Sequence, residues 1–171
     1  MYSYKEAMGV ASDILESIED LVQCSSVAGS LRRRKQQVHD IDIVLIPIEP
    51  RFGNVIIRTP LPIFPTIISG RIQSALGGEL LKKGSKLLQM KVKGIQTDIY
   101  CSNHKQWGIH LLRWTGSRFH NIELCRRAQD LGLKLSVSEG LMKDGHVIAS
   151  QSEVEIFDAL QLPYKEPWER D

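Results

Sequence analysis

The sequence has few cysteines and no long apolar run. Only three cysteines occur among its 171 residues, Cys24, Cys101 and Cys125, and no two of them form a C-x-x-C pair. Widely spaced cysteines in odd number argue against a disulfide framework or a zinc site, so we expect reduced, structural thiols. No apolar run approaches the roughly 20 residues of a membrane span, and the first residues lack the apolar core of a signal peptide. These absences predict a cytoplasmic protein with no membrane partner.

Net charge is also small, at +2, although 25% of the residues are charged. The positive residues are nevertheless clustered: residues 32–35 read R-R-R-K, and a second block has no acid among its lysines. That second block contains Lys82, Lys83, Lys86, Lys91 and Lys93. Basic patches on a nearly neutral chain favour contact with nucleic acid on one side. A solvated basic surface is the alternative, because charge runs often serve only solvation.

The most informative stretch joins a Gly-Ser turn, a run of cations and a strand. Residues 29–35 read G-S-L-R-R-R-K, and residues 39–46 read H-D-I-D-I-V-L-I. The alternation predicts a strand on which Asp40 and Asp42 share one face while Ile41 and Ile43 line the other. Two adjacent carboxylates are tolerated mainly when a cation lies between them, and divalent metals take oxygen ligands.

The upstream residues extend this hypothesis to a nucleotide. A Gly-Ser turn offers backbone N–H groups and a hydroxyl, and the neighbouring arginines offer planar cations that suit a triphosphate. The two segments together therefore predict a metal-dependent nucleotide site. A D-x-D pattern alone has an alternative interpretation as a solvated strand edge, so a third carboxylate elsewhere in the chain is the feature to look for.

A third carboxylate appears on a predicted hairpin. Residues 86–92 and 95–101 alternate in polarity and are separated by Lys93-Gly94, which is typical of a tight turn. Asp98 shares a strand face with Gln96 and Tyr100. If this strand lies beside the one that begins near Asp40, three carboxylates converge, which is the ligand set of a two-metal centre.

The remaining pattern before residue 104 is less regular. Residues 3–22 have helical periodicity, and residues 23–28 suggest a strand. Five prolines between residues 47 and 65 mark an irregular connection around one possible strand, Val55-Ile56-Ile57, and residues 66–83 can form a helix weakened at Gly77-Gly78. The expected helix stripes are Met8, Ala11, Leu15, Ile18 and Val22 in the first, and Ile67, Ile68, Ile72, Leu76 and Leu80 in the second.

After residue 104 the pattern is mixed. We expect a helix that ends at residues 115–117, a second helix capped by Ser117 and ending near Gly132, and a hairpin formed by residues 133–137 and 146–149. Ser152 with Glu155 predicts a capping box at the start of a last helix. The whole chain is therefore predicted as α/β (α+β), with one subdomain at residues 1–104 and a smaller one at residues 105–171.

Five segments in order carry a resemblance to a known family. They read G-S-L-R-R-R-K, H-D-I-D-I-V-L-I, Q-T-D-I-Y, R-W-T-G-S and L-P-Y-K-E-P-W-E-R. In this order and spacing they resemble the polymerase core of family X DNA polymerases, over nearly the whole chain. The Gly-Ser and D-x-D portion is shared by the wider nucleotidyltransferase superfamily, whereas the W-T-G-S segment and the tail narrow the resemblance to family X.

The resemblance implies a nucleotidyltransferase palm built on a mixed sheet with flanking helices, and a C-terminal subdomain that selects the nucleotide. It implies that Asp40, Asp42 and Asp98 bind two Mg²⁺ ions, for which Mn²⁺ can substitute, and that Asp98 accepts the primer proton. The implied nucleotide-binding residues are Gly29, Ser30, Arg33, Arg113, Trp114, Thr115, Gly116 and Asn121. Arg113 stands where many members carry a tyrosine that selects against ribose, so the sugar preference stays open.

The implied partners are dNTP and gapped or primer-template DNA, with Lys82, Lys83, Lys86 and Arg126 on the DNA, and the protein is expected to be a monomer. No segment resembles the family's N-terminal lyase domain or helix-hairpin-helix repeats, so we expect a minimal enzyme for short-gap repair with weak, salt-sensitive DNA binding. Two alternatives stay open: a template-independent or RNA- or protein-directed nucleotidyltransferase, and an inactive module that binds DNA ends.

Overall fold

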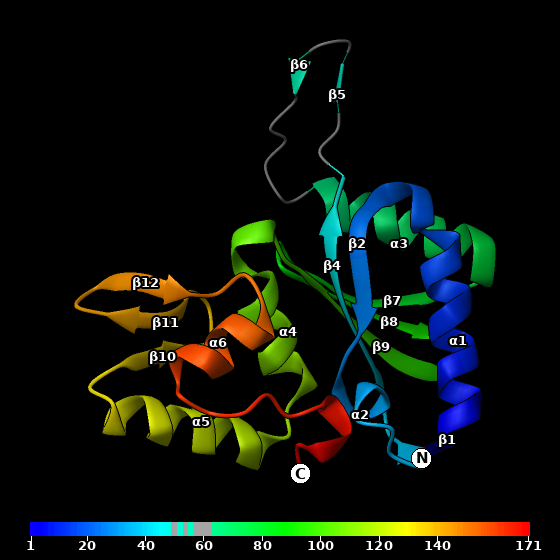
Figure 1. Cartoon of the computed structure of the whole chain (residues 1–171). Coiled ribbons are helices and arrows are strands. Elements are labelled where there is room, and N and C mark those ends of the chain that lie inside the picture. The colour runs from blue at the N-terminus through cyan, green and yellow to red at the C-terminus, as the bar shows by residue number, and fades with distance from the viewer. Residues whose placement is uncertain (49–50, 53–54, 57–62) are drawn as a thin grey trace.

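The structure is a computed structural model that describes residues 1–48, 51–52, 55–56 and 63–171. A five-stranded mixed sheet forms its centre (Figure 1). Its strands, in spatial order, are β2 (Val22–Val27), β4 (Ile41–Pro47), β9 (Ile95–Cys101), β8 (Leu87–Val92) and β7 (Glu79–Lys83). Only the β4–β9 pair of this sheet is parallel; the other neighbours are antiparallel. The α+β class predicted from the sequence is confirmed.

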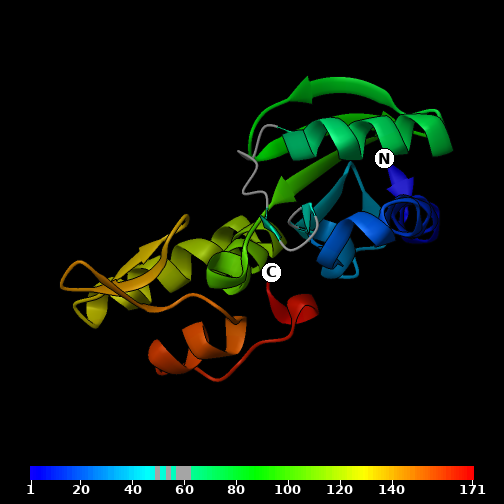
Figure 2. The same ribbon diagram turned by 90° about the horizontal axis from the view of Figure 1, so that it is seen from above.

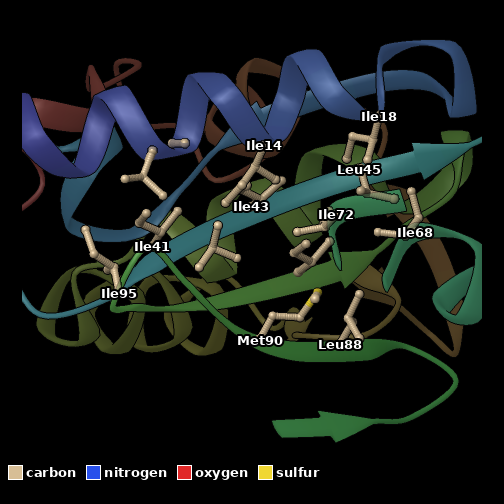
Figure 3. Packing of buried hydrophobic residues seen from close by; sticks show 14 of the residues in the cluster. Ile14, Ile18, Ile41, Ile43, Leu45, Ile68, Ile72, Leu88, Met90 and Ile95 are labelled. Atoms are coloured by element: carbon tan, nitrogen blue, oxygen red, sulfur yellow. The ribbon is translucent and has the colours of Figure 1, made fainter. Parts of the chain in front are cut away.

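Two helices, α1 (Tyr4–Ser17) and α3 (Ile63–Leu76), cover one face of this sheet. Figure 3 shows their isoleucines meeting the apolar side chains of β4 and β8. Ile41, Ile43 and Leu45 of β4 are fully buried there, as the alternation predicts. Val44 is also fully buried, against the opposite face, so β4 is covered on both sides of the sheet.

The buried face of α1 differs in part from the predicted one. Met8 and Leu15 are only partly buried, whereas Ala7, Val10 and Ile14 form the buried face together with Ala11 and Ile18. The helix is also shorter than predicted, because α1 ends at Ser17 and a 3-10 turn, η1 (Glu19–Leu21), follows it. Several sets of apolar residues could form the buried face of a helix here, and packing against the sheet determines which set is buried.

The predicted helix over residues 66–83 was wrong in its second half. The α3 helix ends at Leu76, Gly77 has a φ of 70°, and the chain then forms β7. Leu80 is 37% exposed on that strand and does not join the helix stripe. A small antiparallel pair, β5 (Arg51–Phe52) with β6 (Val55–Ile56), lies in the proline-rich connection. The predicted strand there included Ile57, which lies outside the described residues.

The hairpin of β8 and β9 is confirmed, with Lys93 at φ 47° and Gly94 at φ 86°. Positive φ at both central residues is the two-residue turn that matches the twist of antiparallel strands. Its register pairs Gln89 with Asp98 and Leu88 with Ile99. The hairpin therefore places alternate residues of β9 on opposite faces of the sheet, as predicted.

The C-terminal part packs around an apolar cluster of its own. Figure 2 shows its helices and strands gathered on one side of the central sheet. Its elements are η2 (His104–Gln106), α4 (Trp107–Thr115), α5 (Arg118–Asp130), β10 (Lys134–Ser136), β11 (Gly140–Lys143), β12 (His146–Ala149), α6 (Glu153–Ala159) and η3 (Pro167–Glu169). The α4 helix lies against the sheet face opposite α1 and α3, where Leu111 packs with Val44 and Tyr100. A functional division near residue 104 stays a prediction.

Two expectations for this part need correction. The predicted hairpin joined residues 133–137 directly to residues 146–149. In the structure an unpredicted strand, β11, lies between them: it pairs with β10 and forms the hairpin with β12. The hydroxyl of Ser152 accepts the Glu155 backbone N–H, but the Glu155 carboxylate accepts the N–H groups of Ser150 and Gln151, so the predicted capping box is not closed. Ser117 caps α5 as predicted, accepting the His120 N–H.

Within the described residues, no helix is both long enough and apolar enough to cross a membrane. The end of the chain returns to the first part: in Figure 1 the C-terminal segment lies beside α2 (Gly29–Arg32). The Arg34 guanidinium lies 3.7 Å from the centre of the Trp168 ring, and Arg33 and Lys35 face the Asp171 carboxylate. The segment that follows α6 therefore contacts the basic run after the Gly-Ser turn.

Candidate nucleotidyltransferase site

The parallel pairing of β4 and β9 brings two carboxylates side by side. Asp42 and Asp98 are direct register partners across these strands, and they face the side of the sheet that α4 covers. Asp40 lies immediately before β4 and is partly buried. Its charge acts on Asp42, whose pKa it helps to raise. The three candidate carboxylates thus lie at one end of two adjacent strands.

Neutral donors hold these carboxylates in place. The Tyr100 hydroxyl lies 3.3 Å from an Asp42 carboxylate oxygen and 3.4 Å from one of Asp98. The side-chain amides of Gln89 and Gln96 donate to Asp98 at 3.0 and 3.2 Å. Among the described residues, no lysine or arginine forms an ion pair with Asp40, Asp42 or Asp98. The negative charge of the cluster is therefore hydrogen-bonded and not neutralised.

This charge perturbs Asp42 strongly. Burial, followed by the nearby charges of Asp40 and Asp98, raises the pKa of Asp42 from 3.8 to about 7, although Tyr100 and Arg33 act in the opposite direction. A carboxyl group that resists ionisation beside two others is the electrostatic condition that a divalent cation relieves.

The fit of a metal ion can be judged from these donors. Carboxylate oxygens on adjacent strands are the ligand type that Mg²⁺ takes. However, no three His, Cys, Asp or Glu side chains in the described ranges are gathered closely enough to hold a metal ion. The predicted gathering of three carboxylates is thus not seen among the described residues. The donor chemistry of the register partners Asp42 and Asp98 fits Mg²⁺.

Gly29 packs directly against the carboxylate of Asp42. Its φ is 55°, and a Cβ atom added there would lie 1.9 Å from Asp42 Oδ2. The Ala28 N–H donates to the Asp42 carbonyl at 2.8 Å, which fixes the turn to β4. Both the backbone conformation and the space require glycine. The turn therefore brings Ser30, which is partly buried in α2, next to the carboxylate cluster.

Arg33 joins the Gly-Ser turn to the end of α4. Its Nη1 donates to the Thr115 carbonyl, and a Cβ atom on Gly116, which has a φ of 71°, would lie 3.2 Å from that nitrogen. The buried Arg33 Nε makes no hydrogen bond among the described residues and lies 3.9 Å from an Asp171 carboxylate oxygen. The structure thus brings together Arg33, Thr115 and Gly116, three of the predicted nucleotide-binding residues.

Arg113, Trp114 and Asn121 lie at the same end of α4. The Trp114 ring stacks on Tyr100 with centroids 3.6 Å apart and planes 13° apart, and the Arg113 guanidinium lies 4.5 Å from the Trp114 centroid. The Asn121 amide donates to the Arg113 carbonyl at 2.9 Å. One Asn121 donor is therefore engaged in holding the junction between α4 and α5.

A buried charge network was missed in the sequence. Arg32 donates two hydrogen bonds to the Glu153 carboxylate, at 2.9 and 2.7 Å, and one to the Thr115 hydroxyl. Arg170, which is fully buried, donates at 2.6 Å to Glu153 Oε1, the oxygen that also accepts one of the Arg32 hydrogen bonds. The sequence shows Arg32 as the first cation of the basic run. It gives no local indication that the partner of Arg32 is a glutamate 121 residues away.

The predicted DNA-contacting residues are exposed but not gathered. Lys82 and Lys83 lie on the outer strand β7, Lys86 precedes β8, and Arg126 lies on α5. Lys83 donates to the Thr66 hydroxyl at 3.2 Å. Their exposure leaves them accessible to a polyanion on two separate parts of the fold.

His120 adjoins Asn121 in the sequence but lies in the core of the C-terminal part. It is 3% exposed and stacks on Phe157 with ring centroids 5.8 Å apart. Burial, with Arg170 and Lys165 nearby, lowers the pKa of His120 to about 4. The imidazole is therefore a neutral core residue of the C-terminal part.

Two comparisons relate this chain to known DNA polymerases. A model of the family described as DNA polymerase beta thumb matches residues 110–171. The chain is also similar to DNA polymerase lambda of Rattus norvegicus, with 26% identity over 186 residues that cover 90% of this chain and 31% of the relative. The chain thus spans about a third of the length of the curated relative it matches.

Together with the mixed sheet and its flanking helices, these matches define a polymerase beta-like α+β fold. The C-terminal part is thus similar to the thumb of DNA polymerase beta, and most of the chain is similar to a part of DNA polymerase lambda.

Proposed function

We propose that this chain is a DNA-directed DNA polymerase of family X type, which transfers a nucleotidyl group from dNTP to the 3′-hydroxyl of a DNA primer during short-gap repair. The observation that carries the proposal is the register pairing of Asp42 with Asp98, beside the Gly29 turn. Phosphoryl transfer needs in-line positioning and charge neutralisation more than covalent chemistry. A carboxylate cluster next to backbone N–H groups and a guanidinium supplies those two needs.

The metal would be held by Asp40, Asp42 and Asp98. A bound pair of Mg²⁺ ions would supply charge neutralisation at the attacking and leaving oxygens. Asp98, which lies at the partly exposed edge of the cluster, would accept the proton of the primer hydroxyl. No lysine or arginine in the described ranges forms an ion pair with the cluster, and this supports the assignment, because carboxylates without a paired cation favour metal binding.

The nucleotide would lie between the Gly-Ser turn and the end of α4. Ser30 and Arg33 would hold the β- and γ-phosphates, and the bend at Thr115-Gly116 would receive the sugar. The contact of Arg33 with the Thr115 carbonyl supports placing both ends of the nucleotide at one site. Arg113 and Asn121 would then lie near the base and sugar.

DNA would bind across the exposed cations on β7 and α5. Lys82, Lys83 and Lys86 form one group of phosphate contacts, and Arg126 belongs to another. Each neutralised phosphate changes the logarithmic salt slope by about −0.9, so few contacts give weak and strongly salt-dependent affinity. A nanomolar affinity that does not change with salt would contradict this proposal.

The direct test is filling of a one-nucleotide gap in labelled DNA with each dNTP and NTP. Asp98→Asn should lower the rate by about a thousandfold or more, corresponding to several kcal/mol of barrier, while circular dichroism stays unchanged. Asp130→Asn, at the exposed end of α5, is the matched control and should retain full activity. Equal activity of wild type and Asp98→Asn would remove the proposed role of Asp98.

The same assay distinguishes the alternatives. Extension that ignores the template base indicates a template-independent transferase, and labelling of RNA or protein in place of DNA indicates another acceptor. DNA-end binding without any nucleotide transfer indicates an inactive binding module. Any of these three results overturns the proposed templated polymerase.

A further inference from the structure

Tyr100 is the one side chain seen to contact two of the three proposed metal ligands within the described ranges. Its hydroxyl lies 3.3 Å from Asp42 Oδ1 and 3.4 Å from Asp98 Oδ2. Because a phenol carries one proton, it cannot donate fully to both carboxylates at once. Both distances exceed the usual 2.7–2.8 Å of an O–H···O bond, so each interaction is weak.

The ring of Tyr100 is held firmly by its neighbours. It stacks face to face on Trp114, with centroids 3.6 Å apart, and its residue is only 8% exposed. Val44 and Leu111 complete an apolar surround between the sheet and α4. The hydroxyl is consequently directed to one place, the gap between the carboxylates of β4 and β9.

We propose that Tyr100 is a positioning residue that keeps Asp42 and Asp98 together while no metal is bound, and that its hydroxyl competes with the cation for their oxygens. This inference rests on the proposed metal-dependent function. A neutral hydroxyl satisfies carboxylate oxygens without cancelling their charge, so the carboxylates of Asp42 and Asp98 stay side by side and still attract a cation. The cation must displace both weak hydrogen bonds before the ligand set closes.

The position of the Tyr100 hydroxyl explains why the carboxylates of Asp42 and Asp98 are register partners and yet do not converge on one point. Strand pairing fixes their backbones, and the hydroxyl lies between their side chains. Trp114 stacks on the ring of the same phenol, so a sugar placed near Trp114 would adjoin the residue that positions the metal ligands. Nucleotide and metal binding therefore meet at Tyr100.

The test compares Mn²⁺ affinity, measured by electron paramagnetic resonance without nucleotide, in wild type, Tyr100→Phe and Tyr164→Phe. Tyr100→Phe keeps the aromatic stack and removes only the hydroxyl, so it should bind Mn²⁺ about three- to tenfold more tightly. Tyr164 is the matched control, because its hydroxyl also lies 3.4 Å from a carboxylate oxygen, that of Glu153, away from the carboxylate cluster. Tyr164→Phe should leave the Mn²⁺ affinity unchanged.

An unchanged or weaker Mn²⁺ affinity in Tyr100→Phe overturns the inference, because the hydroxyl then does not compete with the cation. Failure of wild type and both variants to bind Mn²⁺ overturns the proposed function itself. If Tyr100→Phe does not fold, ultraviolet difference spectra of the wild type titrated with Mg²⁺ replace it. A tyrosine difference signal that saturates with Mg²⁺, and is retained in Tyr164→Phe, supports displacement of the Tyr100 hydroxyl, and absence of that signal contradicts it.

Discussion

Asp42→Asn should make the metal-free protein more stable while removing its activity. The pKa of Asp42 in the folded protein is about 7, compared with 3.8 for an ordinary aspartate, because of burial and the charges of Asp40 and Asp98. One pKa unit corresponds to about 1.4 kcal/mol, so ionised Asp42 costs the folded state about 2–4 kcal/mol, the lower end allowing for solvent screening. Asparagine has nearly the same shape and carries no charge.

The pH dependence follows from the direction of this pKa change. Between about pH 4 and pH 7 the folded state binds the Asp42 proton more tightly than the unfolded state does, so stability falls as the pH rises through this window. Below pH 4 both states are protonated, and above pH 7 the whole penalty is present. His120 contributes with the opposite sign, because its pKa is lowered to about 4 and the folded state prefers the neutral ring.

The assay is guanidinium unfolding in EDTA at pH 5 and pH 8, for wild type and Asp42→Asn. The variant retains His120, so the difference between the two proteins isolates Asp42. We expect Asp42→Asn to be more stable at pH 8 by about 2–4 kcal/mol, with a smaller advantage at pH 5. Equal stability of the two proteins at pH 8 would refute the electrostatic argument, and gap filling by Asp42→Asn would refute the proposed role of the residue.

Three further predictions use other parts of the structure. Glu153→Gln should lower the free energy of unfolding by about 3–5 kcal/mol, because it leaves Arg32 and the buried Arg170 without their shared carboxylate; an effect as small as that of exposed Asp20→Asn in the same denaturant titration would contradict this. Gly29→Ala should lower gap-filling activity at least about a hundredfold, because its Cβ would lie 1.9 Å from an Asp42 oxygen. Gly145→Ala, which also has a positive φ but an empty surround, should retain activity, and equal losses in both variants would show a backbone effect alone. Replacing Lys82 and Lys83 by Gln should reduce the logarithmic salt slope of DNA binding by about 1 for each phosphate that is no longer neutralised, and an unchanged slope in fluorescence anisotropy would exclude β7 from the DNA surface.

The predictable parts of the fold are those set by neighbouring residues. The alternation around Ile41 and Ile43 specifies a strand and its buried face, because side chains on a strand point alternately to its two sides. Lys93-Gly94 specifies a hairpin, because a two-residue turn needs two positive φ angles. Both features depend on short stretches of consecutive residues, and both were correct.

The buried face of a helix was less predictable, because it depends on residues that are distant in the sequence. Several apolar stripes are available on residues 4–17, and the choice of Ile14 over Leu15 as a buried residue depends on the sheet beneath. The split of residues 66–83 into α3 and β7 likewise depends on a free sheet edge, since β7 forms only by pairing with β8. Local propensity at Gly77-Gly78 weakened the helix but did not indicate a strand.

The order of residues along the chain predicts which side chains carry the chemistry, namely carboxylates at 40, 42 and 98 and a Gly-Ser turn followed by arginines. The folded arrangement places β4 parallel to β9, so that Asp42 and Asp98 are partners, pairs Glu153 with Arg32, and puts the Tyr100 hydroxyl between two carboxylates. Such contacts join residues that are distant along the chain, and they form because the folded state buries the strands and helices together. The local pattern of polar and apolar residues does not specify which distant segments pair.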